Sequence, residues 1–376
     1  MRIQRLRAIG WRNLGPLDLV LDPAVKVNVL YGDNGQGKTN VLEALYYAAT
    51  FRSFRTSDSA DLIQAGASEA RIGTDIDTES LVRSVETRLV RTEAAIVRTI
   101  RLDGKGIHGV RAAFGVLGVV LFVPEDLLLV RAAPAARRRF LDMAISGVER
   151  GYFAEAAAFQ KVLRSRNALL RTGRAPASPG LLDTYDEQLA IAGARVVVRR
   201  RALVGALGTS IQSIFQALHA ALSVELTYES DPRVAAAISE IDVVAALLAG
   251  LLERRSTDER RGHTTFGPQQ DDLGIRLDGR PAHEHASQGQ LRSLVLALKL
   301  AELSNLEACR GETPVLLLDD VPSELDPTRR RYLFEALARL SCQTMISVAD
   351  RTLVPRVDAR ADWQVVGGRL MAAPAA

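Results

Sequence analysis

Residues 32–39 read Gly32-Asp33-Asn34-Gly35-Gln36-Gly37-Lys38-Thr39, which fits the pattern Gly-x-x-x-x-Gly-Lys-Thr. Alternating valines at 25, 27 and 29 precede this stretch, and apolar residues at helical spacing follow it from Val41 to Ala49. The stretch therefore joins a strand to the N-terminus of a helix. Glycines in such a loop let backbone N–H groups surround phosphates, and the helix end adds partial positive charge. We interpret the stretch as a phosphate-binding loop.

The last two residues of this loop carry distinct chemistry. The ammonium group of Lys38 is expected to reach the β- and γ-phosphates and to take part in catalysis, whereas the hydroxyl of Thr39 is expected to hold Mg²⁺. We assign all eight loop residues, together with Asn40, to nucleotide binding. ATP and Mg²⁺ are the cofactors that this assignment predicts.

A second element, which ends in two acidic residues, lies about 280 residues further along the chain. The apolar run from Pro314 to Leu318 ends in Asp319 and Asp320, as a buried strand would end at the edge of a parallel sheet. Such a strand sets a carboxylate beside the metal of a phosphate-binding loop. Asp319 is predicted to hold Mg²⁺, and Asp320 is predicted to act as the base that polarises the attacking water.

A third element, Ser287-Gln288-Gly289-Gln290, opens an apolar helical pattern that runs through Leu291 and Leu303. Serine and glycine at a helix N-terminus form an end that binds anions. We assign these four residues to nucleotide contact as well.

Length and composition bound the remaining possibilities. A chain of 376 residues can hold two domains. It has no apolar run of about 20 residues and no secretory signal at its N-terminus, so we expect a cytoplasmic protein without a membrane partner. Its two cysteines, Cys309 and Cys342, are too few for a disulfide framework or a zinc site.

The net charge permits a polyanionic partner without requiring one. The net charge is +4, and arginine clusters occur in a helical region from about 134 to 262. These clusters form either a face that binds duplex DNA or a solvated helix surface, and the sequence leaves both open. Arg52 and Arg55, after the loop helix, likewise contact phosphates or face solvent. Aromatic residues do not interleave with the arginines, which favours phosphate contacts to a duplex over stacking on single strands. The two clusters comprise Arg195, Arg199, Arg200 and Arg201, and Arg254, Arg255, Arg260 and Arg261.

The order of these elements resembles an ABC-type ATPase head of the SMC-like group. Within that group the chain is similar, over essentially its whole length, to the RecF family of bacterial recombination mediators. The most specific stretches are Ser53-Phe54-Arg55-Thr56, Phe122-Val123-Pro124-Glu125-Asp126-Leu127, Arg137-Arg138-Arg139-Phe140-Leu141-Asp142 and Asp319-Asp320-Val321-Pro322-Ser323-Glu324-Leu325-Asp326. The resemblance implies an α/β head with a mixed sheet flanked by helices and an inserted, mainly helical second lobe. We expect the head at 1–125 and 265–376, and the helical lobe at 126–264.

The resemblance also implies a function. Members of this family are expected to be weak, DNA-dependent ATPases that form homodimers on ATP and clamp duplex DNA near single-strand gaps. Slow hydrolysis resets the clamp, and the proteins RecR and RecO are the expected partners in loading the recombinase. Roles in replication restart and the SOS response, and association with the nucleoid, follow from the same resemblance.

Two departures from the family pattern stand out. The usual Gly-Pro-His-Arg-Asp-Asp-Leu reads here with Gln269 and Gln270 in place of His and Arg, which leaves the role of that loop open. The His that often follows the next strand in ABC heads is absent from Ser347-Val348-Ala349-Asp350. We take Ser347 as the candidate for the γ-phosphate contact at that position.

Other classes of protein fit the sequence less well. The ATPase subunit of a transporter shares the motifs but does not need so long a separation between them. An SMC arm, or another SMC-like chromosome-maintenance ATPase with long arms, needs heptads over many turns. A signalling GTPase needs Asn-Lys-x-Asp, and no Asn in this chain precedes a Lys. His283-Glu284-His285 is expected to be an exposed segment, because no further metal ligands of suitable spacing follow it.

Overall fold

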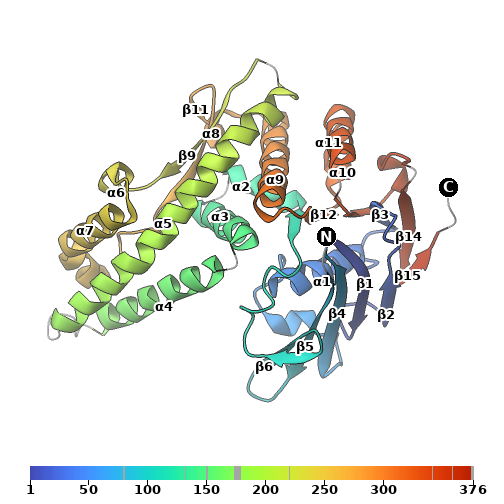
Figure 1. Ribbon diagram of the computed structural model, residues 1–376, viewed down its shortest axis with the longest axis horizontal. Coiled ribbons are helices and arrows are strands. Elements are labelled where there is room, and N and C mark those ends of the chain that lie inside the picture. The colour runs from blue at the N-terminus through green and yellow to red at the C-terminus, as the bar shows by residue number, and fades with distance from the viewer. Residues whose placement is uncertain are drawn as a thin grey trace. The chain divides into compact units, whose positions relative to one another are not determined.

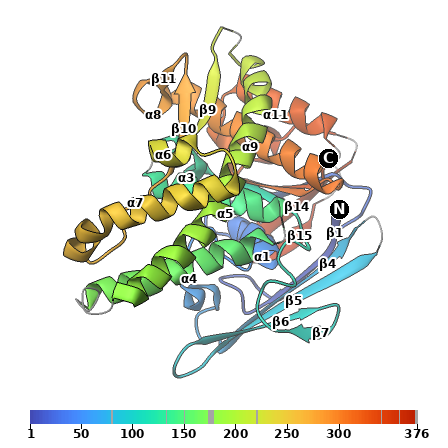
Figure 2. The same ribbon diagram turned by 60° about the vertical axis from the view of Figure 1, so that its left-hand side comes forward.

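The computed structural model describes residues 1–78, 81–131, 133–149, 151–172, 179–219, 221–340, 342–357 and 359–373. Glycine and proline residues at 172–180 predict a break between helices, and most of that segment lies outside the described residues. The chain divides into two compact units, one formed by Met1–Asp126 with Glu302–Ala376 and the other by Leu127–Ala301. Their helices and strands are labelled in Figure 1 and seen from a second direction in Figure 2.

An antiparallel sheet forms one part of the first unit. Asp103-Gly104 forms the hairpin turn between the last two of its strands. In spatial order the described strands are β2 (Leu17–Val20), β1 (Arg2–Ile9), β4 (Glu69–Asp77), β5 (Val82–Arg91), β6 (Ile96–Leu102) and β7 (Lys105–Ile107).

A second sheet carries the phosphate-binding loop. All neighbouring pairs of its described strands are parallel except β14 with β15, so the carboxyl ends of β3, β13 and β12 meet at one edge. Its strands lie in the order β15 (Arg369–Ala372), β14 (Arg360–Val366), β3 (Val27–Tyr31), β13 (Thr344–Val348), β12 (Val315–Asp319) and β8 (Val119–Phe122).

Helix α1 (Lys38–Thr50) contacts strands of both sheets, and most of its residues are buried. The buried amide of Gln343 joins the sheets directly, since it accepts from the backbone N–H of Ile3 at 2.7 Å and donates to the Ile3 carbonyl at 3.0 Å. The first unit is completed by short helices and by α11. These are η1 (Ser59–Leu62), α10 (Val321–Glu324), α11 (Pro327–Arg339) and η3 (Arg351–Leu353).

The second unit is mainly helical. Its core lies among the long helices α4, α5 and α7, where Phe159, Val197 and Leu247 are almost fully buried. Residues 232–236 and 240–261 form two helices separated at 237–239, and Ser239 caps the second helix through a capping box with Asp242. The helices are α2 (Leu128–Arg131), α3 (Pro134–Val148), α4 (Tyr152–Arg171), α5 (Pro179–Gln216), α6 (Pro232–Ala236), α7 (Glu240–Arg261), α8 (Ala282–His285) and α9 (Gln288–Arg310), with η2 (Pro124–Leu127) and α9 continuing across the two boundaries of the unit.

The boundary of the helical lobe differs from the expectation. We expected the head to resume at residue 265, but 265–301 belong to the second unit. The reason is strand pairing: β10 (Asp272–Leu277) pairs along its length with β9 (Val224–Glu229), and β11 (Arg280–Pro281) pairs with β10. Such long-range pairing leaves no local signal in composition.

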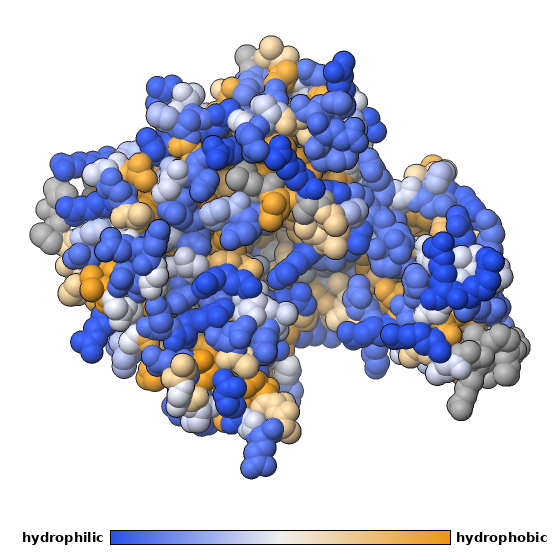
Figure 3. Space-filling view, turned by 180° about the vertical axis from the view of Figure 1, so that it is seen from behind, coloured by the Kyte–Doolittle hydropathy of each residue, from blue (hydrophilic) through white to orange (hydrophobic). Residues whose placement is uncertain are grey.

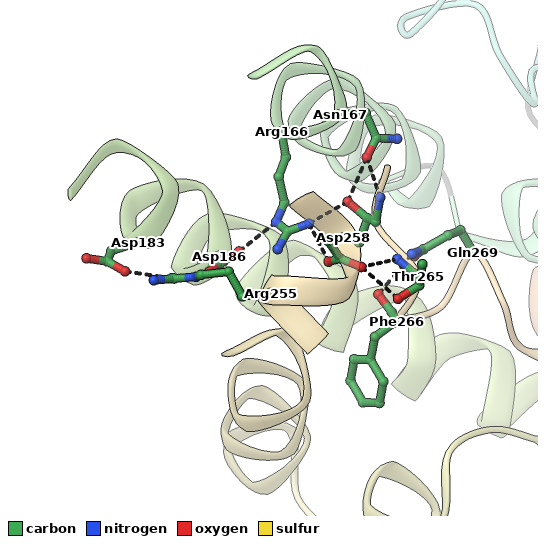
Figure 4. A network of polar contacts seen from close by, with 10 residues as sticks. Arg166, Asn167, Asp183, Asp186, Arg255, Asp258, Thr265, Phe266 and Gln269 are labelled. Atoms are coloured by element: carbon green, nitrogen blue, oxygen red, sulfur yellow. Dashed lines mark hydrogen bonds and ion pairs between the residues drawn. The ribbon is translucent and has the colours of Figure 1, made fainter. Parts of the chain in front are cut away.

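A buried ionic network joins three elements of the second unit (Figure 4). The Arg166 side chain of α4 is fully buried, donates to Asp186 of α5 at 2.6 Å and donates to Asp258 of α7 at 2.8 Å. Arg255 adds bonds to Asp183 and Asp186 from α7. Because a buried charge without a partner is costly, these pairs fix the mutual register of the three helices.

Candidate nucleotide-binding site

The phosphate-binding loop connects β3 to α1 as predicted. Gly32, Gly35 and Gly37 have φ values of 145°, 80° and 110°, which residues with a side chain rarely adopt. Space is also limited at the first and last of these glycines. A Cβ on Gly32 would lie 2.5 Å from the Val365 carbonyl oxygen, and one on Gly37 would lie 3.0 Å from Asn13 Oδ1. The glycine spacing of the motif is therefore required by the backbone.

The Lys38 side chain lies along this loop. Its Nζ donates to the carbonyl oxygens of Gly32 at 2.6 Å and Asp33 at 2.9 Å. Burial lowers the pKa of Lys38, while the nearby carboxylates of Asp320, Asp319 and Asp33 act in the opposite direction. The ammonium thus sits among the loop carbonyls, where an incoming phosphate would find a charged donor.

The structure brings Thr39 and Asp319 together although they are 280 positions apart. Thr39 Oγ1 donates to Asp319 Oδ1 at 2.8 Å, and Asp319 is only 8% exposed. Burial raises the pKa of the Asp319 carboxyl, against hydrogen bonds from Ser347 and Thr39 that lower it. A hydroxyl and a carboxylate oxygen are the hard ligands that suit Mg²⁺, which usually takes few protein ligands plus phosphate oxygens. These two residues fit the predicted metal role.

Asp320, the predicted base, begins the turn after β12. Its backbone has a φ of 52°, and its carboxylate accepts a 2.5 Å hydrogen bond from the hydroxyl of Ser323. Unlike Asp319, Asp320 is only partly buried, so its side chain is open to an attacking water.

Ser347 does not have the position expected of a γ-phosphate contact. Its side chain is 1% exposed, and its hydroxyl donates to Asp319 Oδ1 at 2.5 Å. The reason is strand register, since Ser347 is the residue of β13 directly paired with Asp319 of β12. The hydroxyl of Ser347 therefore contacts Asp319 of β12 and does not point to where a nucleotide would bind.

Sequence reasoning missed residues that brace the loop. Asn13 Nδ2 donates to the Gly35 carbonyl at 3.0 Å, and Asn13 Oδ1 accepts from Asn40 Nδ2 at 2.6 Å. The turn at 367–368 donates two backbone N–H bonds to Gln36, one of them to its side chain at 2.6 Å. Nothing in the local sequence shows where the segment 11–16 would pack.

Asn40, assigned to nucleotide contact, belongs to a polar cluster under the loop. Besides the bond to Asn13, its Oδ1 accepts from Arg55 Nη1 at 2.7 Å. The fully buried Glu43 nearby pairs with Arg12 and accepts from the Ser53 hydroxyl at 2.5 Å. The Arg55 guanidinium thus contacts Asn40 of the loop helix, although Arg52 and Arg55 are both exposed residues.

Ser287, Gln288, Gly289 and Gln290 lie in the second unit, at the start of α9. Ser287 and Gln290 form a reciprocal cap, in which the Ser287 N–H donates to Gln290 Oε1 at 2.7 Å and the Gln290 N–H donates to Ser287 Oγ at 3.2 Å. The predicted helix N-terminus is confirmed, and the role of these residues toward nucleotide stays a prediction.

The loop with the two family departures is structural. Gln269 Nε2 donates to the Phe266 carbonyl at 2.9 Å. Asp271 accepts from the Tyr228 hydroxyl at 2.6 Å, and Asp272 forms a two-bond pair with Arg137 at 2.7 Å. These contacts tie β10 to α3 and β9. His283 and His285 are exposed as expected, and no group of three or more potential ligands among the described residues could hold a metal.

The arginine clusters divide into bound and free members. Arg200 is 3% exposed and pairs with Asp142, and Arg201 donates to carbonyls of α6 and its end. Arg195, Arg199 and Arg255 lie in ion pairs. Arg254, Arg260 and Arg261 are exposed on the last part of α7 and form no ion pair within the described part of the chain. Of the two clusters, these three arginines best suit the duplex-binding interpretation, because no ion pair among the described residues engages their charge.

Comparisons with known proteins now bear on the whole chain. Residues 2–365 match the family model of the RecF/RecN/SMC N-terminal domain. The DNA replication and repair protein RecF of Anaeromyxobacter sp. (strain Fw109-5) is 41% identical over 356 residues, which cover 94% of each chain. The chain belongs to the RecF family. The RecF protein of Myxococcus xanthus (strain DK1622) is 38% identical over 94% of this RecF-family chain and 92% of its own length.

Solved structures agree with this family membership. The recombination mediator protein RecF-ATP of the RecFOR pathway superposes with a TM-score of 0.90 at 28% identity, covering 99% of this chain and 97% of that chain. An Smc head bound to a domain of ScpA matches with a TM-score of 0.58 at 15% identity, covering 99% of this chain and 97% of its own, and shares the fold alone. The predicted fold class, an α/β ATPase head with a mainly helical second lobe, is confirmed.

Two further observations concern the surface and the alternatives. In the part of the chain that the structure describes, no helix combines the length and apolar character needed to cross a bilayer. Hydrophilic residues predominate over the face drawn in Figure 3, where apolar residues occur in small groups. The transporter alternative is not favoured, because the similar proteins are DNA replication and repair proteins named RecF and a RecF mediator structure.

Proposed function

We propose that this protein binds and slowly hydrolyses ATP with Mg²⁺, and that ATP makes it dimerise and clamp duplex DNA near single-strand gaps. The single observation that carries the proposal is the 2.8 Å bond between Thr39 and Asp319. It assembles the two predicted metal residues beside the phosphate-binding loop, which is the arrangement that nucleotide hydrolysis needs. Mg²⁺ would neutralise charge on the phosphates there.

The chemistry of the site supports division of labour among its residues. Lys38 supplies a positive charge to the phosphates, and Asp319 with Thr39 holds the metal. Asp320 orients the attacking water, since its carboxylate is the acidic group of the pair that is open to solvent. The N–H groups of the loop stabilise the charge that develops on the phosphate oxygens.

The number of nucleotide-binding elements in one chain supports dimerisation. It has one phosphate-binding loop and one Ser287–Gln290 element. In the ABC heads that the sequence resembles, these two elements face each other across two subunits, so two ATP molecules would join a homodimer. Ligand binding of this kind favours the dimer by mass action.

The DNA and protein partners rest on family membership. The RecF structures to which the chain is similar are of a mediator in the RecFOR pathway, and we propose RecR and RecO as partners here. Exposed arginines near the end of α7 are the candidates for duplex contact. Action in the cytoplasm on the nucleoid, and a role in the SOS response, follow from the same proposal.

Binding to defined DNA substrates tests the proposed function. Purified protein is mixed with duplex, single-stranded and gapped DNA without nucleotide, with ADP and with ATP and Mg²⁺. We expect ATP to strengthen binding to duplex and gapped DNA and to produce dimers on them. Affinity that is the same in all nucleotide states would count against the proposal.

A further inference from the structure

Ser347 occupies a fixed position beside the acidic strand. β13 and β12 are parallel, and their register pairs Ser347 with Asp319. Side chains of directly paired residues project to the same face of a sheet. Every residue of β13 is buried, and Ser347 is 1% exposed. A serine at this position is therefore placed against the Asp319 carboxylate, away from water.

One hydroxyl contacts both acidic residues. Ser347 Oγ donates to Asp319 Oδ1 at 2.5 Å and accepts from the backbone N–H of Asp320 at 3.1 Å. The same N–H also lies 3.0 Å from the Ser347 carbonyl oxygen. Asp320 has a φ of 52°, a conformation that a residue with a side chain holds only when its surroundings enforce it. Ser347 supplies part of that constraint.

The other donor to Asp319 is not equivalent to Ser347. Thr39 Oγ1 reaches the same carboxylate oxygen at 2.8 Å, but Thr39 is itself predicted to hold the metal. Ser347 stands outside the predicted metal-binding set, so its bond does not compete with that role. Groups of this kind, which orient a ligand without touching the metal, typically change metal affinity 10- to 100-fold when removed.

We infer that Ser347 is a positioning residue that sets the Asp319 carboxylate for Mg²⁺ and the Asp320 backbone for hydrolysis. The inference rests on the proposed function. It assigns to Ser347 no contact with the nucleotide. Removal of its hydroxyl should therefore affect the metal dependence of nucleotide binding and leave metal-free binding intact.

Mg²⁺ titration of nucleotide binding tests this inference without relying on turnover. Binding of a fluorescent ATP analogue is measured in EDTA and then at increasing Mg²⁺ for wild type and Ser347→Ala. We expect metal-free affinity within about twofold of wild type and a Mg²⁺ midpoint raised about tenfold. Ser347→Thr keeps the hydroxyl and should restore the midpoint. Ser347→Cys keeps the volume with a weak donor and should fall between.

Thr344→Val is the matched control, because it removes another buried hydroxyl from the same strand, one that lies beside Cys342. Its Mg²⁺ midpoint should equal that of wild type. A Ser347→Ala midpoint within twofold of wild type would overturn the inference, and so would an equal shift in Thr344→Val. Wild type that showed no effect of Mg²⁺ on nucleotide binding would overturn the proposed function itself, and this inference with it.

Discussion

The hydroxyl of Ser323 donates a 2.5 Å hydrogen bond to the carboxylate of Asp320. Asp320 is the N-cap residue of the short helix α10, and Ser323 lies within that helix. Many ABC heads that resemble this site carry Glu where Asp320 stands, and Asp is shorter by one methylene, roughly 1 Å. A misplacement of that size can cost about 10²-fold in rate. On the proposed function we therefore expect slow hydrolysis, with ATP acting as a timer.

Replacement of Asp320 by Asn should separate binding from turnover. The amide cannot accept a proton from water as a carboxylate does, whereas Lys38, Thr39 and Asp319 are untouched. We expect Asp320→Asn to bind ATP normally, lose hydrolysis and accumulate a long-lived ATP-bound dimer on DNA. Single-turnover hydrolysis and the lifetime of the DNA complex measure the two effects.

Lys38→Met provides the contrasting variant, since it removes the charge that meets the phosphates. It should lose nucleotide binding and dimerisation together. Hydrolysis by Asp320→Asn at the wild-type rate, or a complex on DNA no longer-lived than that of wild type, would show that Asp320 is not the base.

A charge at Ser287 should block dimerisation without affecting ATP binding. An arginine there adds bulk and removes the cap hydroxyl at the start of α9, where the γ-phosphate of a partner subunit is proposed to dock. We expect Ser287→Arg to bind ATP within about threefold of wild type and to remain monomeric with ATP in light scattering. The helix α9 should stay folded in this variant, because the loss of one cap costs only about 1 kcal/mol.

Ser239→Arg is the matched control for that variant. Ser239 forms the same kind of capping box at the start of α7, and its hydroxyl accepts from the Asp242 N–H at 3.2 Å. Both variants should therefore lose similar stability, but only Ser287→Arg should fail to dimerise. If Ser287→Arg formed dimers at the ATP concentrations at which wild type does, the proposed role of Ser287–Gln290 in dimerisation would be refuted.

Binding to duplex DNA should depend on salt through the three exposed arginines of α7. Removal of one arginine that neutralises a phosphate should reduce the slope of log affinity against log salt by about 0.9. We expect combined Gln substitutions at Arg254, Arg260 and Arg261 to reduce this slope by about 2 to 3 and to weaken duplex binding at low salt. Wild type should prefer duplex over single strands.

The control is a second triple variant that also removes three positive charges. Gln substitutions at Arg195, Arg199 and Arg233 remove three guanidinium groups that lie within 3.9, 3.0 and 2.5 Å of glutamates in the same unit. Their effect on the slope should be small, because these charges are already paired. An equal reduction of the slope in both triple variants would mean that net charge, and not a surface of α7, governs DNA binding.

Local patterns predicted what depends on neighbouring residues in the sequence. The loop at 32–39 has its own signature, and the run 314–320 ends as a buried strand must, so the sequence alone predicts a shared metal role for Thr39 and Asp319. Arg200 illustrates the limit: it shares a run of arginines with Arg199, yet it is buried against Asp142. Which arginine of a run turns inward depends on helix packing, and charge patterning does not contain that information.

The same limit applies to the strand partners and to the loop braces. Because β10 pairs with β9, the head resumes at residue 302 and not at the expected residue 265. Asn13 reaches the phosphate-binding loop only because the turn before β2 packs beside it. Both contacts join segments that are distant in sequence, so composition and periodicity could not reveal them.

Asp271 should make the stability of the second unit depend on pH in an unusual direction. This residue is 7% exposed, and burial raises its pKa to about 6, against nearby arginines and the Tyr228 hydroxyl, which lower it. The folded protein therefore holds this proton more tightly than the unfolded chain does. Between the ordinary pKa, near 4, and 6, the contribution of Asp271 to stability falls as the pH rises. A shift of about two pH units corresponds to a cost on the order of 3 kcal/mol above pH 6.

Asp271→Asn removes that ionisation while its amide oxygen can still accept from Tyr228 Oη. We expect the free energy of unfolding of the variant, relative to wild type, to increase from about pH 4 to pH 6 and then to stay constant. Denaturant unfolding followed by far-ultraviolet circular dichroism measures this difference.

Asp242→Asn is the control of opposite sign, because hydrogen bonds from Ser239 lower the pKa of Asp242. Its ionised form stabilises the fold above about pH 4, so that variant should become relatively less stable as the pH rises. A pH-independent difference for Asp271→Asn would mean that Asp271 ionises as readily in the folded protein as in the unfolded chain.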